Sequence, residues 1–377
     1  MLTTTRSAEC TVPPAVLFLS FELGSRRWKL AFAVGLSHRP RIIEIPARDL
    51  ERVRKEIGRA KKRLELPADA PVRSCYEAGR DGFWLHRALT AAGVSNVVVD
   101  PSSIAVDRRA RRAKTDRLDA VALVIQLIQA TAGDPRGWRE VRVPSVTAED
   151  DRQLHRERDA VRNAKRAVWN RIQGLLMTHG LPTPPARGDA TVFATLRLWD
   201  GSPLPEGLRG RLEREWTELL ALAARLRTIT GLIHARAQAD DAVGEQSRGL
   251  MRLRGIGAVG SVTLSTELFA WRAFQNGRQV GAIVGLTPTP YQSDQSAREQ
   301  GVSRAGNGRV RALMLELAWG WTRYQPSSAL TQWYRDRFGQ HGRARKVGIV
   351  ALARKLLIAL WRWVDQGVVP DGAVLKA

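Results

Sequence analysis

The order of short apolar runs in the first third of the chain constrains the fold more than any other feature. Residues 16–21 and 28–34 are rich in leucine, valine and aromatic side chains, which predicts two strands, and 42–45 predicts a short third strand. Residues 49–64 follow with helical spacing and many basic side chains. Three successive strands followed by a helix indicate the start of a sheet with helical cover.

Strand and helix patterns then alternate. Strands are predicted at 72–76 and 96–99, and helices at 82–92 and 115–130. Strand-strand-strand-helix-strand-helix-strand-helix is an α/β order, and it is the order of the ribonuclease-H-like fold. We therefore expect an α/β domain of this type over residues 14–145.

The middle of the chain has no strand pattern. Residues 149–179 and 212–238 are long, charged and rich in alanine and arginine, and a Pro/Gly-rich segment at 181–210 separates them. This organisation predicts an antiparallel, coiled-coil-like helical arm over residues 146–245. Packing of these helices on their neighbours and oligomerisation through the arm are equally good interpretations.

The last block, residues 246–377, is expected to be mostly α-helical. Residues 253–260 (LRGIGAVG) precede an apolar helix and resemble a helix-hairpin-helix turn, whose glycines allow close backbone approach and whose helix amides can hold a phosphate. Plain helix packing is the alternative, and a dinucleotide site is disfavoured because no strong strand precedes the glycines. A polar loop is expected at 287–307, and a basic tract with tryptophan and tyrosine at 335–362.

Composition points to a polyanionic partner. The 377 residues include 60 Lys and Arg against 37 Asp and Glu, a formal charge of +23 that is spread along the whole chain. A spread excess favours an extended nucleic-acid surface over a targeting tail. No apolar stretch reaches the roughly 18 to 20 residues of a membrane span, and residues 1–11 lack a signal-peptide pattern, so we expect a cytoplasmic protein without a membrane partner. The presence of only Cys10 and Cys75 argues against a disulfide framework and against a zinc ribbon.

Four acidic residues stand where an α/β order could bring them together. Glu22 ends the first strand, Glu77 follows the strand at 72–76, and Asp116 and Asp119 lie three residues apart, on one face of the last helix. In a ribonuclease-H-like sheet these places converge on one edge. Four carboxylates there are tolerable only with divalent cations, which favours Mg²⁺ or Mn²⁺ and metal-assisted phosphodiester chemistry. Taken singly, each acid would more often be a solvated loop residue, and the Asp116/Asp119 pair fits an ordinary polar helix start as well as it fits a metal site, so the prediction depends on the joint pattern.

These acidic segments resemble the motifs of the RuvC-like "DEDD" insertion-sequence transposases, the insertion-sequence one-ten family, which includes site-specific DNA invertases. The segments are 21–25 (FELGS), 76–79 (YEAG) and 114–120 (KTDRLDA), with 96–101 resembling the short strand and proline before the last motif. Four further segments resemble motifs of that family's C-terminal transposase domain, namely 255–257 (GIG), 285–288 (GLTP), 291–294 (YQSD) and 301–307 (GVSRAGN). The resemblance spans nearly the whole chain.

The resemblance implies a DNA recombinase with a split active site. Glu22, Glu77, Asp116 and Asp119 would bind the metals, and Ser293 would attack a DNA phosphate to form a phosphoserine link, with Ser296 as its nearby rival. It further implies donor and target DNA, a non-coding guide (bridge) RNA that pairs with both, and a homodimer or homotetramer. Arginines flanking the loop could contact phosphates or could equally be exposed surface charges: Arg298, Arg304, Arg309 and Arg311.

Two other functions remain open. A RuvC-like nuclease or junction resolvase would hydrolyse DNA with the four acids alone. A degenerate transposase that only binds nucleic acid is suggested by two departures from the family pattern, Glu22 in place of aspartate and Asp294 in place of glycine. Glutamate is one methylene longer, whereas Mg²⁺ requires near-ideal octahedral geometry.

Overall fold

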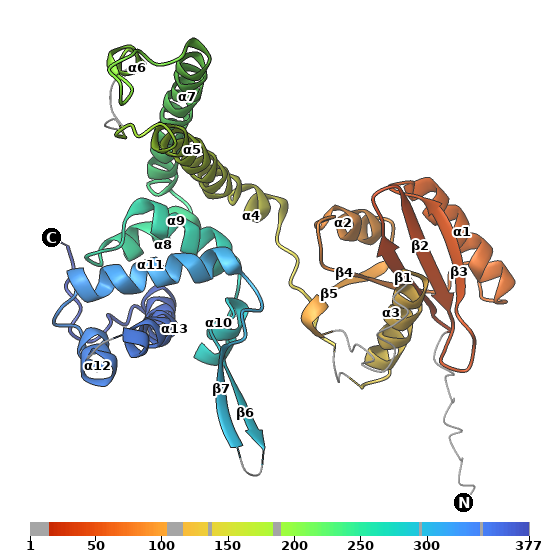
Figure 1. Cartoon of the computed structure of the whole chain (residues 1–377). Helices are drawn as coiled ribbons and strands as arrows, with labels where there is room; N and C mark the ends of the chain where they lie inside the picture. Colours follow the sequence, from red (N-terminus) through yellow and green to blue (C-terminus); the bar gives the residue numbers. More distant parts are fainter. Residues whose placement is uncertain are drawn as a thin grey trace, which may run out of the picture. The chain divides into compact units, whose positions relative to one another are not determined.

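The computed structural model describes residues 15–103, 116–134, 138–183, 190–293, 296–339 and 342–376. It divides the chain into two compact units, residues 1–143 and 144–377, and each is described by itself (Figure 1).

A five-stranded mixed sheet forms the centre of the first unit, with strand order β3-β2-β1-β4-β5. The strands are β1 (Leu17–Leu23), β2 (Arg27–Ala33), β3 (Arg41–Pro46), β4 (Val72–Glu77) and β5 (Ser95–Val99). β2 is antiparallel to β1 and β3, whereas β4 is parallel to both β1 and β5. The five predicted strands and the α/β class of this unit are therefore confirmed.

Helices cover both faces of the sheet. On one face α1 (Leu50–Arg63) and α2 (Trp84–Ala91) pack on a core that includes Leu17, Leu19 and Phe21. On the other face α3 (Asp116–Thr131) packs on Phe18 and neighbouring side chains. Alternate residues of β1 point to opposite faces, which explains why nearly every position of this strand is buried. A single 3₁₀ turn, Pro101–Ser103, follows β5.

The second unit begins with the predicted helical arm. Its elements are α4 (Val146–Asp150), α5 (Gln153–Met177), the short α6 (Val192–Thr195) and α7 (Glu206–Arg236). Arg171, late in α5, pairs with Glu215, early in α7, at 2.8 Å, and Arg225 of α7 pairs with Glu157 at the start of α5. The two long helices are therefore antiparallel, with α6 at the far end of the arm (Figure 1).

A helical block completes the second unit. It contains α8 (Ala242–Met251), α9 (Ala258–Leu264), a π-helical segment (Ser265–Phe269), α10 (Gly277–Ile283), α11 (Gly308–Tyr324), α12 (Ala329–Phe338) and α13 (Gly342–Gln366). α8 and α9 are joined by a short turn in which Gly255 has φ +94°, and a Cβ there would lie 3.1 Å from the Cβ of Tyr324. Glycine is therefore required in this turn. Phosphate binding by the turn stays a prediction.

The segment 287–307, expected to be a polar loop, instead contains a β-hairpin. Its strands are β6 (Pro288–Ser293) and β7 (Ser296–Val302), which pair antiparallel from Pro288 opposite Val302 to Ser293 opposite Ser296. The expectation was wrong because the segment is polar and carries two prolines, so it lacks the apolar alternation of a half-buried strand. An isolated two-stranded ribbon does not need that alternation, because backbone pairing alone defines it.

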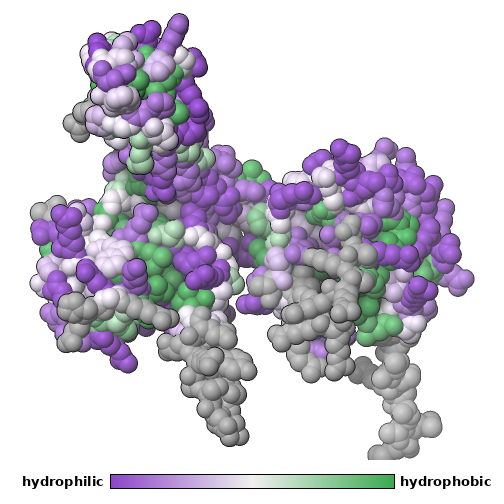
Figure 2. Space-filling view, in the orientation of Figure 1, coloured by the Kyte–Doolittle hydropathy of each residue, from purple (hydrophilic) through white to green (hydrophobic). Residues whose placement is uncertain are grey.

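Hydrophilic side chains cover much of the visible surface of each unit, including the stem of the arm (Figure 2). Within the described ranges, no helix combines the length and the apolar composition that crossing a membrane would require.

Candidate functional site

Glu22 and Glu77 lie at the ends of neighbouring parallel strands. The last paired residues of β1 and β4 are Phe21 and Tyr76, so the two glutamates are the next residues along each strand. Residues paired across parallel strands point to the same face of the sheet. The two carboxylates therefore share one face at the carboxyl edge of β1 and β4.

The start of α3 lies over the same face. Ser20, two residues before Glu22, donates a hydrogen bond from its buried hydroxyl to the carbonyl of Ala120 at 2.6 Å. Ala120 directly follows Asp119, which is half-buried. Because side chains two residues apart in a strand face the same way, the contact places the beginning of α3 beside the Glu22 position.

The predicted cluster is thus brought together in its backbone positions, and we refer to Glu22, Glu77 and Asp119 as the acidic edge. Asp116 begins α3, but its side chain lies outside the described part. Among the described residues, no three His, Cys, Asp or Glu side chains lie close enough together to hold a metal ion. The metal site therefore stays a prediction.

Lys29 is a neighbour of the acidic edge that the sequence did not predict. It pairs with Glu22 across the antiparallel β1 and β2 strands, so both side chains project from the same face. A lysine opposite a carboxylate offsets part of its negative charge. The signal in the sequence was its position one residue after Trp28 in the second strand, but only the register identifies Glu22 as its partner.

Ser293 is the last residue of β6, and its rival Ser296 is the first residue of β7 and pairs with it. The hairpin thus presents both serines at its tip. The side chains of the two serines and of Arg298, and the whole of Asp294, lie outside the described part. Ser293 and the acidic edge belong to different units.

Two glycines fix the base of the hairpin. A Cβ on Gly285 would lie 2.1 Å from the carbonyl oxygen of Ala305, and a Cβ on Gly306 would lie 2.2 Å from that of Ile283. Both glycines also have positive φ, +67° and +91°. No other residue fits these two crossings, which explains the glycines in the segments 285–288 and 301–307.

Asn307 then connects the hairpin to α11. Its side-chain oxygen accepts hydrogen bonds from the backbone N–H groups of Arg309 (3.1 Å) and Val310 (3.2 Å), which caps the helix. Its side-chain amide donates to Oε2 of Glu267 at 3.0 Å. One side chain therefore joins the hairpin, α11 and the π-helical segment.

Glu267 is the centre of a buried polar cluster at the base of the arm. Its carboxylate is 2% exposed and accepts hydrogen bonds from Nε2 of His155 at 2.8 Å and from Nη2 of Arg156 at 3.0 Å. Burial by itself would raise the pKa of the Glu267 carboxyl, but the hydrogen bond from His155 and the charge of Arg156 outweigh it and lower the pKa to about 2. The ionised carboxylate thus ties α5 to the base of the hairpin.

Sequence reasoning missed this cluster. The available signal was a lone acid within the apolar run 262–269 (VTLSTELF), because a charge in such a run is buried only with partners. Of the arginines named as candidates for phosphate contacts, Arg309 pairs with Asp159, and Arg311 donates to the carbonyl oxygens of Val284 and Arg304. Their contact with phosphates stays a prediction. At least these two have structural contacts within the chain.

Comparison with known proteins agrees with the arrangement of motifs. Residues 247–333 match the family described as "Transposase IS116/IS110/IS902 family". The chain is 38% identical over 375 residues to y4rJ of Sinorhizobium fredii, which carries the provisional name of a transposase. The match covers 96% of this chain and 94% of the relative. It is 26% identical to the transposase for insertion sequence element IS1111A of Coxiella burnetii, over 75% of this chain and 74% of the relative.

A third relative, the transposase for insertion sequence element IS1328 of Yersinia enterocolitica, is 27% identical over 57% of this chain and 63% of its own length. The match to y4rJ includes both units, from the sheet to the helical block. The chain therefore belongs to the IS116/IS110/IS902 family of insertion-sequence transposases.

Proposed function

We propose that this transposase exchanges DNA strands with two cooperating parts, a metal-binding acidic edge and the nucleophile Ser293. The observation that carries the proposal is the placement of Glu22 and Glu77 at adjacent strand ends, on the face over which α3 begins. An acid cluster at the edge of a sheet is a favourable place to hold cations against a phosphodiester.

The strand arrangement supports a ribonuclease-H-like (RuvC-like) assignment for the first unit. Three strands form an antiparallel meander, two more are added parallel to β1, and helices cover both faces. In that fold the carboxyl end of the first strand and the end of the fourth are neighbours, which is where this chain carries Glu22 and Glu77.

The residues of the acidic edge fit Mg²⁺ or Mn²⁺. Carboxylate oxygens are the ligands that these hard cations prefer, and Glu22, Glu77 and Asp119, with Asp116 one turn earlier on α3, would provide them. Bound cations would offset the charge of the reacting phosphate and stabilise both its attacking and leaving oxygens. Lys29 would limit the negative charge of the edge before the metal binds.

Ser293 would make the covalent link. Its hydroxyl oxygen forms a bond to a DNA phosphorus atom, the bond from phosphorus to the departing deoxyribose oxygen breaks, and the serine proton leaves the site while that oxygen gains one. The energy of the broken phosphodiester bond is thereby kept in a phosphoserine ester. A hydroxyl of a second DNA strand can then attack this ester, which releases the serine and joins the two strands. The tip of a hairpin anchored by Gly285 and Gly306 suits this role, because its backbone base is rigid.

A guide RNA and a dimer or tetramer belong to the same proposal. Support comes from the charge of +23 spread along the chain, which suits backbone binding with sequence reading left to base pairing. RNA recovered from the purified protein, sequenced and searched for loops complementary to the element ends, tests the guide directly. Recovery of only random cellular RNA would contradict it.

The decisive experiment for the chemistry is capture of a covalent protein-DNA adduct. Labelled element-end DNA is incubated in Mg²⁺ with the full chain and the RNA recovered with it, the protein is denatured, and label that remains attached is measured. The adduct is expected with the unmodified chain and with Ser296→Ala, and is expected to be absent with Ser293→Ala. DNA cleavage that persists in Ser293→Ala would favour the nuclease alternative and exclude the serine mechanism.

One observation favours a second candidate, a protein that only binds nucleic acid. Glu22 is longer than the aspartate of the family pattern and faces Lys29 across the sheet. Under this alternative the unmodified chain forms no adduct, whereas Glu22→Asp combined with Asp294→Gly restores it. Adduct formation by the unmodified chain rejects the alternative.

A further inference from the structure

A row of basic side chains follows one face of α5. We refer to Arg158, Arg162, Lys165 and Arg166 as the α5 stripe. They occupy positions i, i+4, i+7 and i+8, which share one broad face of a helix. From the first to the last the helix rises by about 12 Å. The row is therefore as long as about three or four base pairs of duplex.

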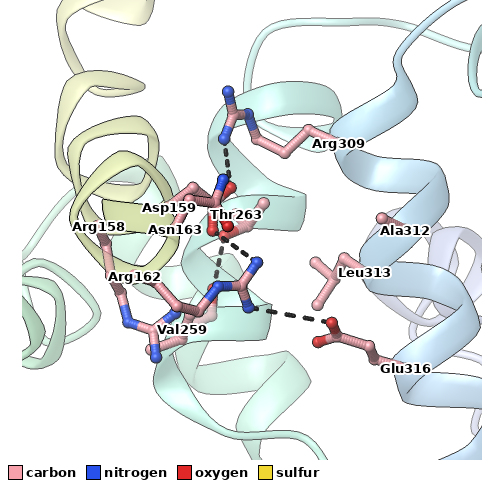
Figure 3. Close-up of a pocket in the computed structure, with 10 residues that line it drawn as sticks. All are labelled: Arg158, Asp159, Arg162, Asn163, Val259, Thr263, Arg309, Ala312, Leu313 and Glu316. Atoms are coloured by element: carbon pink, nitrogen blue, oxygen red, sulfur yellow. Dashed lines mark hydrogen bonds and ion pairs between the residues drawn. The ribbon is translucent and has the colours of Figure 1, made fainter. Parts of the chain in front are cut away.

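The stripe lines two cavities that share Arg162. The lower one, about 290 Å³, lies between α5, α9 and α11. In it Arg309 extends from α11 to Asp159, Arg162 reaches toward Glu316, and the guanidinium of Arg158 points away from Arg309 (Figure 3). The upper one, about 300 Å³, is lined by Arg162, Lys165, Arg166 and Trp169 of α5 and by side chains of α7. Together the cavities form a basic track from the start of α11 up the arm.

The acids along this track are confined to its lower end. Asp159 holds Arg162 at 3.3 Å and also pairs with Arg309, and Glu316 lies 3.9 Å from Arg162. Glu316 is 66% exposed, and such surface pairs contribute only about 0–1 kcal/mol, so an incoming phosphate can displace it. Asp159 orients the two guanidinium groups, and Arg309 also lies 4.0 Å from Glu267, a carboxylate that is already paired with His155 and Arg156.

The other basic groups along the track have no such compensation. Within the described residues, neither Lys165 and Arg166 of the upper cavity nor Arg158 of the lower one forms an ion pair with a carboxylate, although Arg158 donates a hydrogen bond to Oγ1 of Thr230 at 3.4 Å. The buried Nε of Arg162 has no hydrogen-bond partner. Arg309 adds a charge in the first turn of α11, where the helix dipole is also positive. Like charges held this close on one face destabilise the arm unless an anion lies along them.

We propose that the α5 stripe and Arg309 bind consecutive backbone phosphates of a nucleic-acid duplex that lies along the arm. This inference rests on the proposed function, which gives the chain a nucleic-acid substrate. The length of the row and its arginine content suit backbone phosphates and carry no base-reading geometry. DNA and RNA duplexes share this chemistry.

The test is the salt dependence of binding by the full-length protein. A mixed-sequence DNA duplex and an RNA duplex are titrated by fluorescence anisotropy over a range of KCl concentrations. The stripe pair Arg162→Gln with Arg166→Gln is compared with the control pair Arg211→Gln with Arg214→Gln. Arg211 and Arg214 are exposed on α7, and Arg214 is about two and a half turns from Ala223 of the upper cavity, on the opposite side of the helix.

The stripe pair should reduce the slope of log K against log salt by about 1.8 for a duplex that lies along the arm, which is about 0.9 for each lost phosphate contact. The control pair should leave the slope unchanged. A reduced slope with only one of the two duplexes identifies that nucleic acid as the occupant. If the stripe pair unfolds, Arg166→Gln alone, an exposed position, should lower the slope by about half as much.

Equal slopes for the stripe and control pairs, with both duplexes, overturn the inference. A changed oligomeric state with an unchanged slope does the same, because it would identify the stripe as a protein interface. Failure of the proposed function has a different signature, namely a stripe-dependent slope in a protein that forms no Ser293 adduct. A chain that binds neither duplex overturns both.

Discussion

Two carboxylate sites, one in each unit, differ in how the protein balances their charge. Glu267 is buried and receives hydrogen bonds from His155, Arg156 and Asn307. Glu77 is exposed at a strand end and, within the described residues, has no ion pair or side-chain hydrogen bond. A carboxylate already saturated by donors stabilises the fold, whereas an exposed carboxylate such as that of Glu77 can accept a cation.

Removing charge from the acidic edge tests this difference between the two sites most directly. Glu77→Gln and Asp119→Asn keep the side-chain size, so folding should be retained while adduct formation falls about a thousandfold. Metal-ion stabilisation is worth several kcal/mol of transition-state energy, and each 1.36 kcal/mol corresponds to about tenfold in rate. Initial rates of adduct formation with element-end DNA measure the effect.

Glu51→Gln is the matched control, because Glu51 is an exposed acid of the same unit whose described partner is Lys55 at 3.8 Å. Its rate should equal that of the unmodified chain. Rates for Glu77→Gln within tenfold of that value would remove Glu77 from the metal site.

The opposite behaviour is expected of Glu267. Glu267→Gln leaves Arg156 and His155 around a neutral amide, and breaking a buried ion pair in this way costs about 3–5 kcal/mol. The helical unit should therefore unfold at a lower denaturant concentration, which circular dichroism can follow. Glu316→Gln, at an exposed pair, should change the free energy of unfolding by less than about 1 kcal/mol.

Acid should reproduce the effect of Glu267→Gln. The pKa of Glu267 is lowered from 4.5 to about 2, so its stabilising contribution is complete above pH 4.5 and is lost as the pH falls toward 2. The difference in unfolding free energy between the unmodified chain and Glu267→Gln should shrink across this window. A difference that stays constant from pH 5 to pH 2.5 would mean that the carboxyl is not ionised by its partners.

The positions of the acidic edge and of the helical arm are features that the sequence predicts well. The acidic edge depends on strand ends, and those were predictable because Leu17, Leu19 and Phe21 follow one another in a buried strand pattern that stops at Glu22. The antiparallel arm was predictable for a similar reason, since the helical spacing of Val161, Val168 and Ile172 matches a buried face. Both features are local periodicities.

What the sequence could not predict depends on contacts between distant residues. The Glu267 cluster joins residues 155 and 307, which are far apart in the chain, and Lys29 becomes a neighbour of Glu22 only through strand register. The hairpin β6-β7 was missed because its polar strands carry no apolar period. Register and long-range pairing are set by the packed structure, which one sequence pattern does not encode locally.

The smallest expected effect is also the most specific. A cation that binds only the folded acidic edge stabilises the first unit by RT ln(1 + [L]/Kd), about 1.4 kcal/mol when Mg²⁺ is at ten times its Kd. Thermal unfolding with and without MgCl₂, at constant ionic strength, should show this increase in the unmodified chain and in Glu267→Gln, but not in Glu77→Gln. The readout needs neither DNA nor activity, so it separates metal binding from catalysis. Equal stabilisation of all three proteins would place the cation elsewhere, and the acidic edge would then be a polar strand terminus without a metal.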